Sequence, residues 1–277
     1  MVSYLERAQN VDGGLGADRG QPSSQLHSGW AALGLAAAGR DPARVRRGRR
    51  SLLGYLQRGA PEGLRDTGAI ERTILVLRAA GRSPRRFAGR NLVRELARKR
   101  RGDGSIDGLV NLTAFGILAF RAAGKPAGRT PVRQAAGWLL GKQHGDGGFG
   151  LGRGSDVDVT GAALQALVAA GKRRSPAARR AIRFLRRAQN RDGGFPVFPG
   201  GGSNAQSTAF AVQGIVATRR SPRRFRARGS RRDPIAYLRS LIGGDGSVRY
   251  SRSDRRTPVW VSAQALAALK REPFPLR

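Results

Sequence analysis

The stretch that decides the fold is Ala188-Gln189-Asn190-Arg191-Asp192-Gly193-Gly194-Phe195-Pro196. Its Asp-Gly turn returns with small changes at Asp12-Gly13-Gly14-Leu15-Gly16, Asp103-Gly104-Ser105-Ile106, Asp146-Gly147-Gly148-Phe149-Gly150 and Asp245-Gly246-Ser247-Val248. The copies are about 43 to 53 residues apart, except for one gap of double length that Glu62-Gly63-Leu64 fills as a degenerate copy. Six copies of one unit therefore account for the chain of 277 residues.

Each unit reads as two helices of different character. The segment before a turn is amphipathic and rich in Arg, which is typical of an outer helix with one wet side. The segment after a turn is apolar on nearly every face and rich in Ala and Gly, which is typical of a buried inner helix. The expected inner helices are Ser28 to Gly39, Ile70 to Gly81, Thr113 to Gly124, Thr160 to Gly171, Thr208 to Thr218 and Ser262 to Leu269.

The two architectures that fit such a repeat are an open helical solenoid and a closed ring. A solenoid needs atypical polar units at both ends, but the first and last inner helices are as apolar as the middle ones. The sequence therefore predicts an all-α fold, a single α6/α6 toroid domain over residues 1–277. Its twelve helices form two concentric layers, with both termini adjacent, Met1 to Asn10 beside the sixth unit and a central cavity on the axis.

The charge is strongly unbalanced. The chain holds 52 Lys and Arg against 18 Asp and Glu, a net charge of +34. Such a field attracts polyanions or anionic membranes without a dedicated motif, although an Arg-rich coding bias would leave the same composition. We found no nucleic-acid-binding motif, so specific nucleic-acid recognition is not expected.

No apolar run is long enough to span a bilayer, so we expect a soluble protein. Met1 to Gln9 already reads as an amphipathic helix and not as a signal peptide. A true start upstream of Met1 is an open alternative, and the compartment is left open. The absence of Cys removes disulfides, thiolate nucleophiles and zinc sites that need sulfur.

The repeat resembles that of squalene cyclases and of the β subunits of protein prenyltransferases, a superfamily of α/α toroids. The resemblance rests on Ala8 to Gly16, Lys142 to Gly150 and Ala188 to Pro196, and it extends through all six units. The shared Gln-x-x-Asp-Gly-Gly pattern has a structural interpretation. Gln would bond to backbone at the neighbouring turn, Asp would brace the loop, and both Gly residues would take positive φ.

The resemblance implies different chemistries in different branches. A zinc prenyltransferase site of Asp, Cys and His is excluded, since Cys is absent and His27 and His144 are the two histidines. No metal or cofactor is expected. Class II terpene cyclases use the middle Asp of an Asp-x-Asp-Asp-Thr motif as general acid, and Asp156-Val157-Asp158-Val159-Thr160 resembles that motif with Val159 in place of its third Asp. Asp158 is therefore the candidate acid, with Asp156 and Thr160 supporting it.

Two observations argue against cyclase activity. Aromatic residues make up 6% of the chain, although a carbocation needs aromatic faces around it, and the chain is about half as long as the two-barrel cyclases. The alternative role of the acids is to cap an inner helix. The candidates for ligand contacts at the cavity are Asp156, Asp158, Asn111, Gln206, Asn204, Trp30 and Trp260.

Three functions remain open. The first is a non-catalytic binding module whose cavity takes a hydrophobic or amphipathic small molecule. The second is a reduced class II terpene cyclase that uses Asp158. The third is an adaptor for a polyanion or an anionic membrane, bound by a basic rim where inner helices lead into outer ones. The rim residues are Arg46, Arg47, Arg85, Arg86, Arg173, Arg174, Arg219, Arg220, Arg223 and Arg224.

Overall fold

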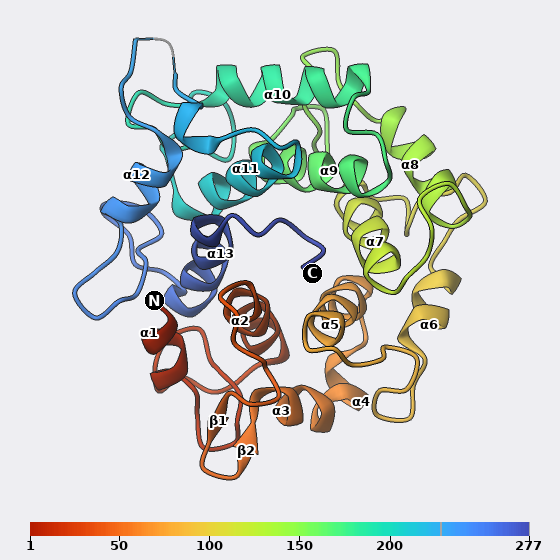
Figure 1. Cartoon of the computed structure of the whole chain (residues 1–277), viewed down its shortest axis with the longest axis vertical. Helices are drawn as coiled ribbons and strands as arrows, with labels where there is room; N and C mark the ends of the chain where they lie inside the picture. The colour runs from red at the N-terminus through yellow and green to blue at the C-terminus, as the bar shows by residue number, and fades with distance from the viewer. Residues whose placement is uncertain (228, 277) are drawn as a thin grey trace.

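The computed structural model describes residues 1–227 and 229–276, which form a ring of helices in two concentric layers (Figure 1). The inner layer consists of α2 (Gln25–Ala37), α5 (Thr67–Ala79), α7 (Val110–Ala122), α9 (Val157–Ala169), α11 (Ala205–Ala217) and α13 (Pro258–Lys270). The outer layer consists of α1 (Val2–Arg7), α3 (Leu52–Arg58), α4 (Ala60–Gly63), α6 (Leu92–Arg98), α8 (Val132–Leu140), α10 (Pro176–Ala188) and α12 (Pro234–Ser240). The α/α toroid is therefore confirmed.

The inner helices begin earlier than the apolar pattern predicts, in most cases by three residues, and each has 13 residues. In four of the six helices, a polar residue before the first turn caps the helix. The caps are Ser24, Asp66, Asp156 and Asn204. The side chain of each accepts the backbone N–H of the residue three positions later. Such caps satisfy donors that have no partner within the helix.

The Asp-Gly turns are rigid loops. In the turn at Asp192, the carboxylate accepts the N–H of Gly194 at 2.9 Å, and the amide of Gln189 donates to Gly193 O at 2.9 Å and to Phe225 O at 3.2 Å. Gly193 has φ +89°, as predicted. Gly194 does not have a positive φ, so the prediction of a positive φ at both glycines was wrong. Gly194 is needed for space instead, since a Cβ there would lie 2.8 Å from the Tyr237 ring.

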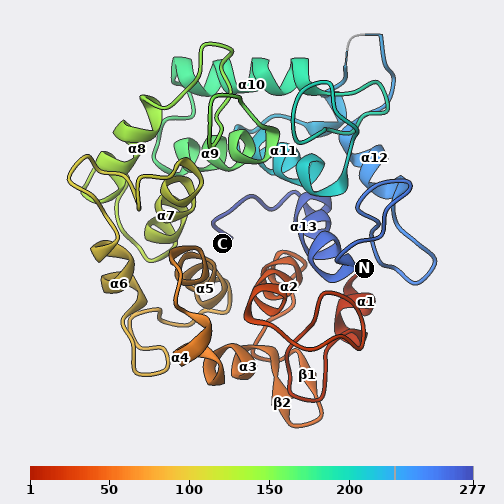
Figure 2. The same cartoon turned by 180° about the vertical axis from the view of Figure 1, so that it is seen from behind.

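The ring is closed. At the N-terminal ends of the inner helices, the N–H of Val157 donates to Val197 O in the next unit, and the N–H of Ala205 donates to Tyr250 O in the unit after that. The N–H of Val259 in the sixth unit donates in the same way to Ala17 O in the first, at 3.1 Å. Both views show α13 beside α2 and α1 beside the sixth unit (Figures 1 and 2).

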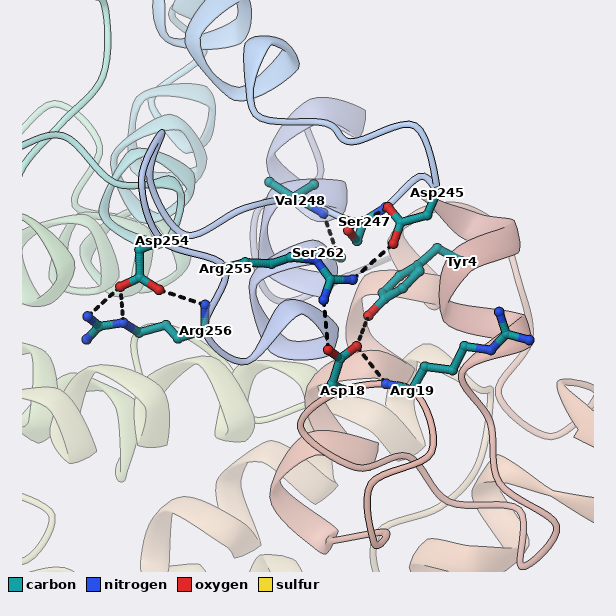
Figure 3. A network of polar contacts seen from close by, with 10 residues as sticks. All are labelled: Tyr4, Asp18, Arg19, Asp245, Ser247, Val248, Asp254, Arg255, Arg256 and Ser262. Atoms are coloured by element: carbon teal, nitrogen blue, oxygen red, sulfur yellow. Dashed lines mark hydrogen bonds and ion pairs between the residues drawn. The ribbon is translucent and has the colours of Figure 1, made fainter.

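Polar contacts join the first and last units at this seam (Figure 3). Arg255 bridges Asp18 at 2.9 Å and Asp245 at 3.0 Å, and the hydroxyl of Tyr4 donates to Asp18 at 2.9 Å. Arg255 and Asp245 are exposed enough for water to weaken their attraction, so each ion pair contributes about 1 kcal/mol or less. Apolar packing of α13 against α2 is the larger contribution to closure.

The described residues differ from the predicted twelve helices in three ways. The second outer helix is split into α3 and α4 at Gly59, just before Pro61, so that thirteen α-helices are present. One short hairpin, β1 (Arg46–Arg47) with β2 (Arg50–Ser51), and one 3₁₀ helix, η1 (Pro222–Arg224), lie in the connectors. The tail after α13 turns into the ring, so the C-terminal end lies near the centre and the prediction of adjacent termini was wrong (Figure 1). None of the described helices meets the length and hydropathy that a membrane span requires.

Candidate functional site

A hydroxyl near the start of five inner helices sets their common register. The side chains of Ser28, Thr113, Thr160, Thr208 and Ser262 are fully buried. Each accepts the backbone N–H of a residue in the preceding turn, at 2.8 to 3.0 Å. In α5 the corresponding residue is Ile70. Residues at the same distance from these anchors are therefore structurally equivalent in the six units.

The residues two positions before the anchors face the ring centre. All six are half-buried, whereas the anchors are fully buried. Gly68 has no side chain, and the other five side chains come from five inner helices at the end of the ring that carries the Asp-Gly turns. We call this set the central face, and its members are Leu26, Gly68, Asn111, Asp158, Gln206 and Trp260.

Aromatic rings meet on the axis directly below the central face. Trp30, Phe115 and Phe210 lie two positions after their anchors, and their ring centroids are 6.1 to 6.4 Å apart with nearly perpendicular planes. Trp260 stacks on Trp30 at 6.1 Å with an interplanar angle of 18°. We call these four residues the aromatic cluster. It fills the axis at a level where the sequence predicted an open cavity, because side chains on i and i+4 positions of the inner helices point the same way.

Asp158 of the central face has an unusual environment. Its Oδ1 is buried and has no hydrogen-bond partner among the described residues. Burial raises the pKa of Asp158 to about 6; contact with the Ser207 hydroxyl lowers this pKa, and the nearby charge of Asp156 raises it. Val159, in place of a third acid, is buried in the packing. Asp158 is therefore an acid whose Oδ1 has no described partner and which keeps its proton to a higher pH than an exposed Asp does.

Asp156, Asn204 and Thr160 are occupied by structural contacts. Asp156 Oδ1 accepts the N–H of Val159 at 2.7 Å, and Asn204 Oδ1 accepts the N–H of Ser207 at 2.8 Å. These two residues are helix caps, which differs from the ligand-binding role predicted for them, because a ligand would have to displace the capped N–H groups. Thr160 is the anchor of α9, and the same contact in other units shows that it is a feature of the repeat.

The other predicted ligand residues do lie at the centre. Asn111 Oδ1 and Trp260 Nε1 are buried without partners among the described residues, and Gln206 Nε2 donates to Gln264 Oε1 at 2.8 Å. Trp30 belongs to the aromatic cluster. Within residues 1–227 and 229–276, no group of three or more acids and histidines is placed to hold a metal ion.

Models of known domain families match most of the chain. The prenyltransferase alpha-alpha toroid domain matches residues 1–55 and 159–267, which is more than half of the sequence. The chain belongs to the prenyltransferase α/α toroid family. The squalene-hopene cyclase C-terminal domain matches residues 90–203, a range that includes Asp158.

Relatives of this toroid include terpene cyclases. It is 32% identical over 168 residues to drimenyl diphosphate synthase from Streptomyces showdoensis, an alignment that covers 59% of the chain and 31% of that protein. It is 21% identical to the solved ent-copalyl diphosphate synthase from Streptomyces platensis, with a TM-score of 0.57, and covers 50% of that chain. The toroid therefore spans about a third to a half of the length of these two proteins.

Other solved toroids match over nearly their full length. Type II terpene cyclase MstE from Scytonema is 13% identical with a TM-score of 0.66, and the alignment covers 97% of the chain and 95% of that structure. A glycosidase solved with glucose is 15% identical with a TM-score of 0.62. At these identities the likeness shows the fold alone, and proteins of different chemistry share it.

Sequence reasoning missed three features around the centre of the toroid. Phe115 and Phe210 complete the aromatic cluster, and a register counted from the Ser and Thr anchors would have found them. Arg72 on α5 occupies the corresponding position in the second unit and is half-buried. Glu71 is fully buried with both carboxylate oxygens unpartnered among the described residues, and this burial raises its pKa well above the usual value.

The C-terminal tail closes the other end of the ring. The N–H of Phe274 donates to Gln165 Oε1 at 2.8 Å, and Gln213 Nε2 donates to Glu272 O at 3.1 Å. The Phe274 ring is buried and lies 6.3 Å from Trp30, on which it packs. A pocket of about 650 Å³ remains between the tail and the C-terminal ends of α7, α9 and α11. The tail therefore supports the aromatic cluster from below.

The predicted rim lies at the tail end of the ring, in the connectors that follow the inner helices. Nine of its ten arginines are exposed, and Arg173 is half-buried. Arg46 and Arg47 form β1, and Arg223 and Arg224 lie in η1. None of the ten forms an ion pair with a described residue. Arg173, Arg174 and Arg220 line a shared surface pocket of about 230 Å³.

Proposed function

We propose that this toroid protein is a class II terpene cyclase in which Asp158 protonates an alkene of a polyprenyl chain. The observation that carries the proposal is the buried Oδ1 of Asp158, which has no described partner and, by the register of α9, faces the same way as the inner-helix positions one turn on, where the aromatic rings meet. An acid whose pKa lies near the working pH is suited to donate a proton. Similarity to drimenyl diphosphate synthase supports this choice over a non-catalytic binding module.

The proposed reaction is an isomerisation. The carboxylic acid of Asp158 gives its proton to one alkene carbon, the π electron pair forms the new C–H bond, and the other carbon becomes a carbocation. The next alkene attacks this cation and closes a ring, and a final cation loses a proton to a base. The faces of Trp30, Phe115 and Phe210 would stabilise the positive charge, once the half-buried Phe side chains move apart to admit the chain.

Neither the low aromatic content nor the chain length excludes an enzyme. The few aromatic residues are concentrated at the axis, where Trp30, Trp260, Phe115 and Phe210 lie together. A type II terpene cyclase of nearly the same length has been solved, so a single toroid is not too short for that chemistry. The missing third Asp remains a difference, and Asp156 is the acid whose charge raises the pKa of Asp158 here.

The test is turnover of farnesyl and geranylgeranyl substrates by the wild type and by Asp158→Asn, with products identified by mass spectrometry. We expect cyclised isomers from the wild type and a loss of about 100-fold or more in the variant. The wild-type rate should fall as the pH rises through about 6, since the protonated form of Asp158 is lost there. Asp66→Asn is the matched control, because Asp66 caps α5 and Asn caps α11 equally well. Absence of turnover with every substrate, or full activity of Asp158→Asn, would overturn the proposal.

The basic rim supports a second function, binding of a polyanion or an anionic membrane. Its ten arginines lie at one end of the ring and are free of described ion pairs. Exposed, uncompensated charge of one sign creates a potential that attracts anions. This function is compatible with a cyclase, because the rim and Asp158 lie at opposite ends of the inner helices.

A further inference from the structure

Arg72 is a cation inside the ring with no bonded partner among residues 1–227 and 229–276. On α5 it occupies the position that Trp30, Phe115 and Phe210 occupy on their own helices. Its guanidinium makes no hydrogen bond or ion pair with any described residue. Burial lowers its pKa, although Asp66 and Glu71 act in the opposite direction. Neither acid is bound to it. Asp66 caps α5, and Glu71 lies against α7, where a Cβ on Gly116 would be 3.1 Å from its Oε1.

Two further N–H groups lie on the neighbouring helices. The side chain of Arg72 packs on α2 at Gly29, where a Cβ would lie 2.8 Å from its Nε. His27 is on the same helix, and burial together with the charge of Arg72 lowers its pKa, so the ring is neutral near pH 7. The edge of His27 meets Trp260 on α13, with centroids 6.2 Å apart. Trp260 Nε1–H is buried and has no described partner.

His27 is held in one orientation by its own helix cap. Ser24 Oγ accepts the backbone N–H of His27 at 3.1 Å and contacts its Nδ1 at 2.8 Å. An oxygen that already accepts one hydrogen bond can direct its own proton to Nδ1. The neutral ring then carries its proton on Nε2, so that His27 offers an N–H donor beside those of Arg72 and Trp260.

Apart from Glu71, whose carboxylate lies against α7, the donors and the unpartnered acceptors of the inner helices are on opposite sides of the axis. Arg72, His27 and Trp260 lie on three consecutive inner helices, α5, α2 and α13, and all three are donors. The unpartnered acceptors Asp158 Oδ1 and Asn111 Oδ1 lie on α9 and α7. The rings of Trp30, Phe115 and Phe210 meet one turn further along the inner helices, at the register position of Arg72.

We infer that Arg72, with His27 and Trp260, binds the phosphate or diphosphate head group of an amphipathic ligand whose apolar chain lies on the aromatic cluster. A guanidinium suits this task because its planar N–H groups match phosphate oxygens, and partial burial strengthens the bond. The chain would then extend toward Asp158 across the ring. Conversion of that chain rests on the proposed cyclase function, whereas head-group binding does not.

The experiment measures binding in the Asp158→Asn background, so that conversion does not enter. Quenching of the intrinsic Trp fluorescence would be titrated with farnesyl diphosphate, farnesol and inorganic pyrophosphate, in high salt to suppress binding to the basic rim. Arg72→Gln should weaken farnesyl diphosphate binding about tenfold or more and leave farnesol binding unchanged. Pyrophosphate should bind the parent and lose most of its affinity in Arg72→Gln.

Arg78→Gln is the matched control. Arg78 lies on the same helix, but its guanidinium donates to Ala122 O and Arg82 O at the tail end of the ring. This variant should bind all three probes as the parent does. The inference is overturned if Arg72→Gln binds farnesyl diphosphate normally, or if it loses farnesol and farnesyl diphosphate affinity to the same extent. If Arg72→Gln selectively weakens farnesyl diphosphate binding but the wild type turns over no substrate, the proposed cyclase function is refuted and the proposed head-group site stands.

Discussion

Glu71 is a buried carboxylate that the proposed chemistry does not use. It is 1% exposed, its oxygens have no described partners, and burial, with repulsion from Asp107, raises its pKa well above the usual value. A folded state that prefers the protonated acid is most stable below the unfolded pKa of about 4.5, and it loses stability as the pH rises above that value. Glu71→Gln should therefore be more stable than the wild type at pH 7, by roughly 1–3 kcal/mol, and equally stable at pH 4.

Chemical denaturation of both proteins between pH 4 and pH 8 checks this prediction. Glu95→Gln is a control for which we expect the opposite change in stability at neutral pH. Glu95 is paired with Arg90 at 2.5 Å, so its loss should lower stability at neutral pH. Parallel pH profiles for the wild type and Glu71→Gln would show that Glu71 is not protonated in the folded protein.

At the level of single residues, the sequence singled out Asp158 as a candidate acid and did not single out Arg72. Asp158 is part of a recognisable motif, so its neighbours along the chain were enough to make it a candidate. The role of Arg72 depends on what surrounds it, namely Gly29 and His27 on another helix. A charged residue in an inner helix stands out in the sequence, but whether it has a partner there can only be read from the fold.

The Asp-Gly turns pack closely against the outer helices that follow them. In the fourth unit, a Cβ at Gly148 would lie 2.5 Å from Ser155 Cβ and 2.9 Å from the Phe184 ring. The turn would have to move away from the outer helix α10, which carries Phe184. We expect Gly148→Ala to lower the free energy of unfolding by about 1–3 kcal/mol.

Gly152→Ala in the same loop provides the comparison, since a Cβ there would meet no atom within 4 Å. That variant should change stability by about 0.5 kcal/mol or less. Thermal and denaturant unfolding of the pair measure the difference. Equal stability of the two variants would mean that the turn relaxes without cost.

At the level of helices, the pattern of apolar residues predicted which segments are inner and outer, and it placed the starts too late. In four inner helices a polar cap precedes the first turn, and in the fourth unit Asp156 is that cap while Asp158 lies in the turn itself. A reading based on hydrophobicity excludes such residues. The split between α3 and α4 was missed because Glu62-Gly63-Leu64 was read as a degenerate turn, although Glu62 and Gly63 lie in α4.

For the whole molecule, the uneven placement of charge predicts where anions bind. Replacing Arg219, Arg220, Arg223 and Arg224 by Gln removes four exposed charges from the rim. Heparin affinity should fall, and its dependence on salt should become shallower by about one unit of slope or more, because fewer counterions are released. Affinity measured by titration at several salt concentrations gives this slope.

The same number of charges can be removed at the other end. Arg19, Arg65, Arg153 and Arg191 are exposed in loops near the Asp-Gly turns. Changing them to Gln should affect heparin binding less than the rim variant does. If the two variants lose the same affinity, the net charge of +34 governs binding and the rim has no special role.

Ring closure was predictable for the whole molecule, and the filling of its axis was not. Closure followed from the apolar first and last inner helices, which pack as α2 and α13. The interior depends on side-chain size and on the tail, where Phe274 lies beneath Trp30. A ring with smaller residues at those positions would have the same repeat pattern and an open centre.

Closure also determines when the molecule can fold during its own synthesis. The apolar surface of α2 packs between α5 and α13, yet α13 begins about 220 residues after α2 ends. At ribosomal speeds of 5–20 residues per second, α2 waits roughly 10 to 45 s for its second neighbour. Throughout that interval one side of the nascent ring is an open apolar edge, which is the surface that chaperones bind and that would otherwise join one unfinished chain to another.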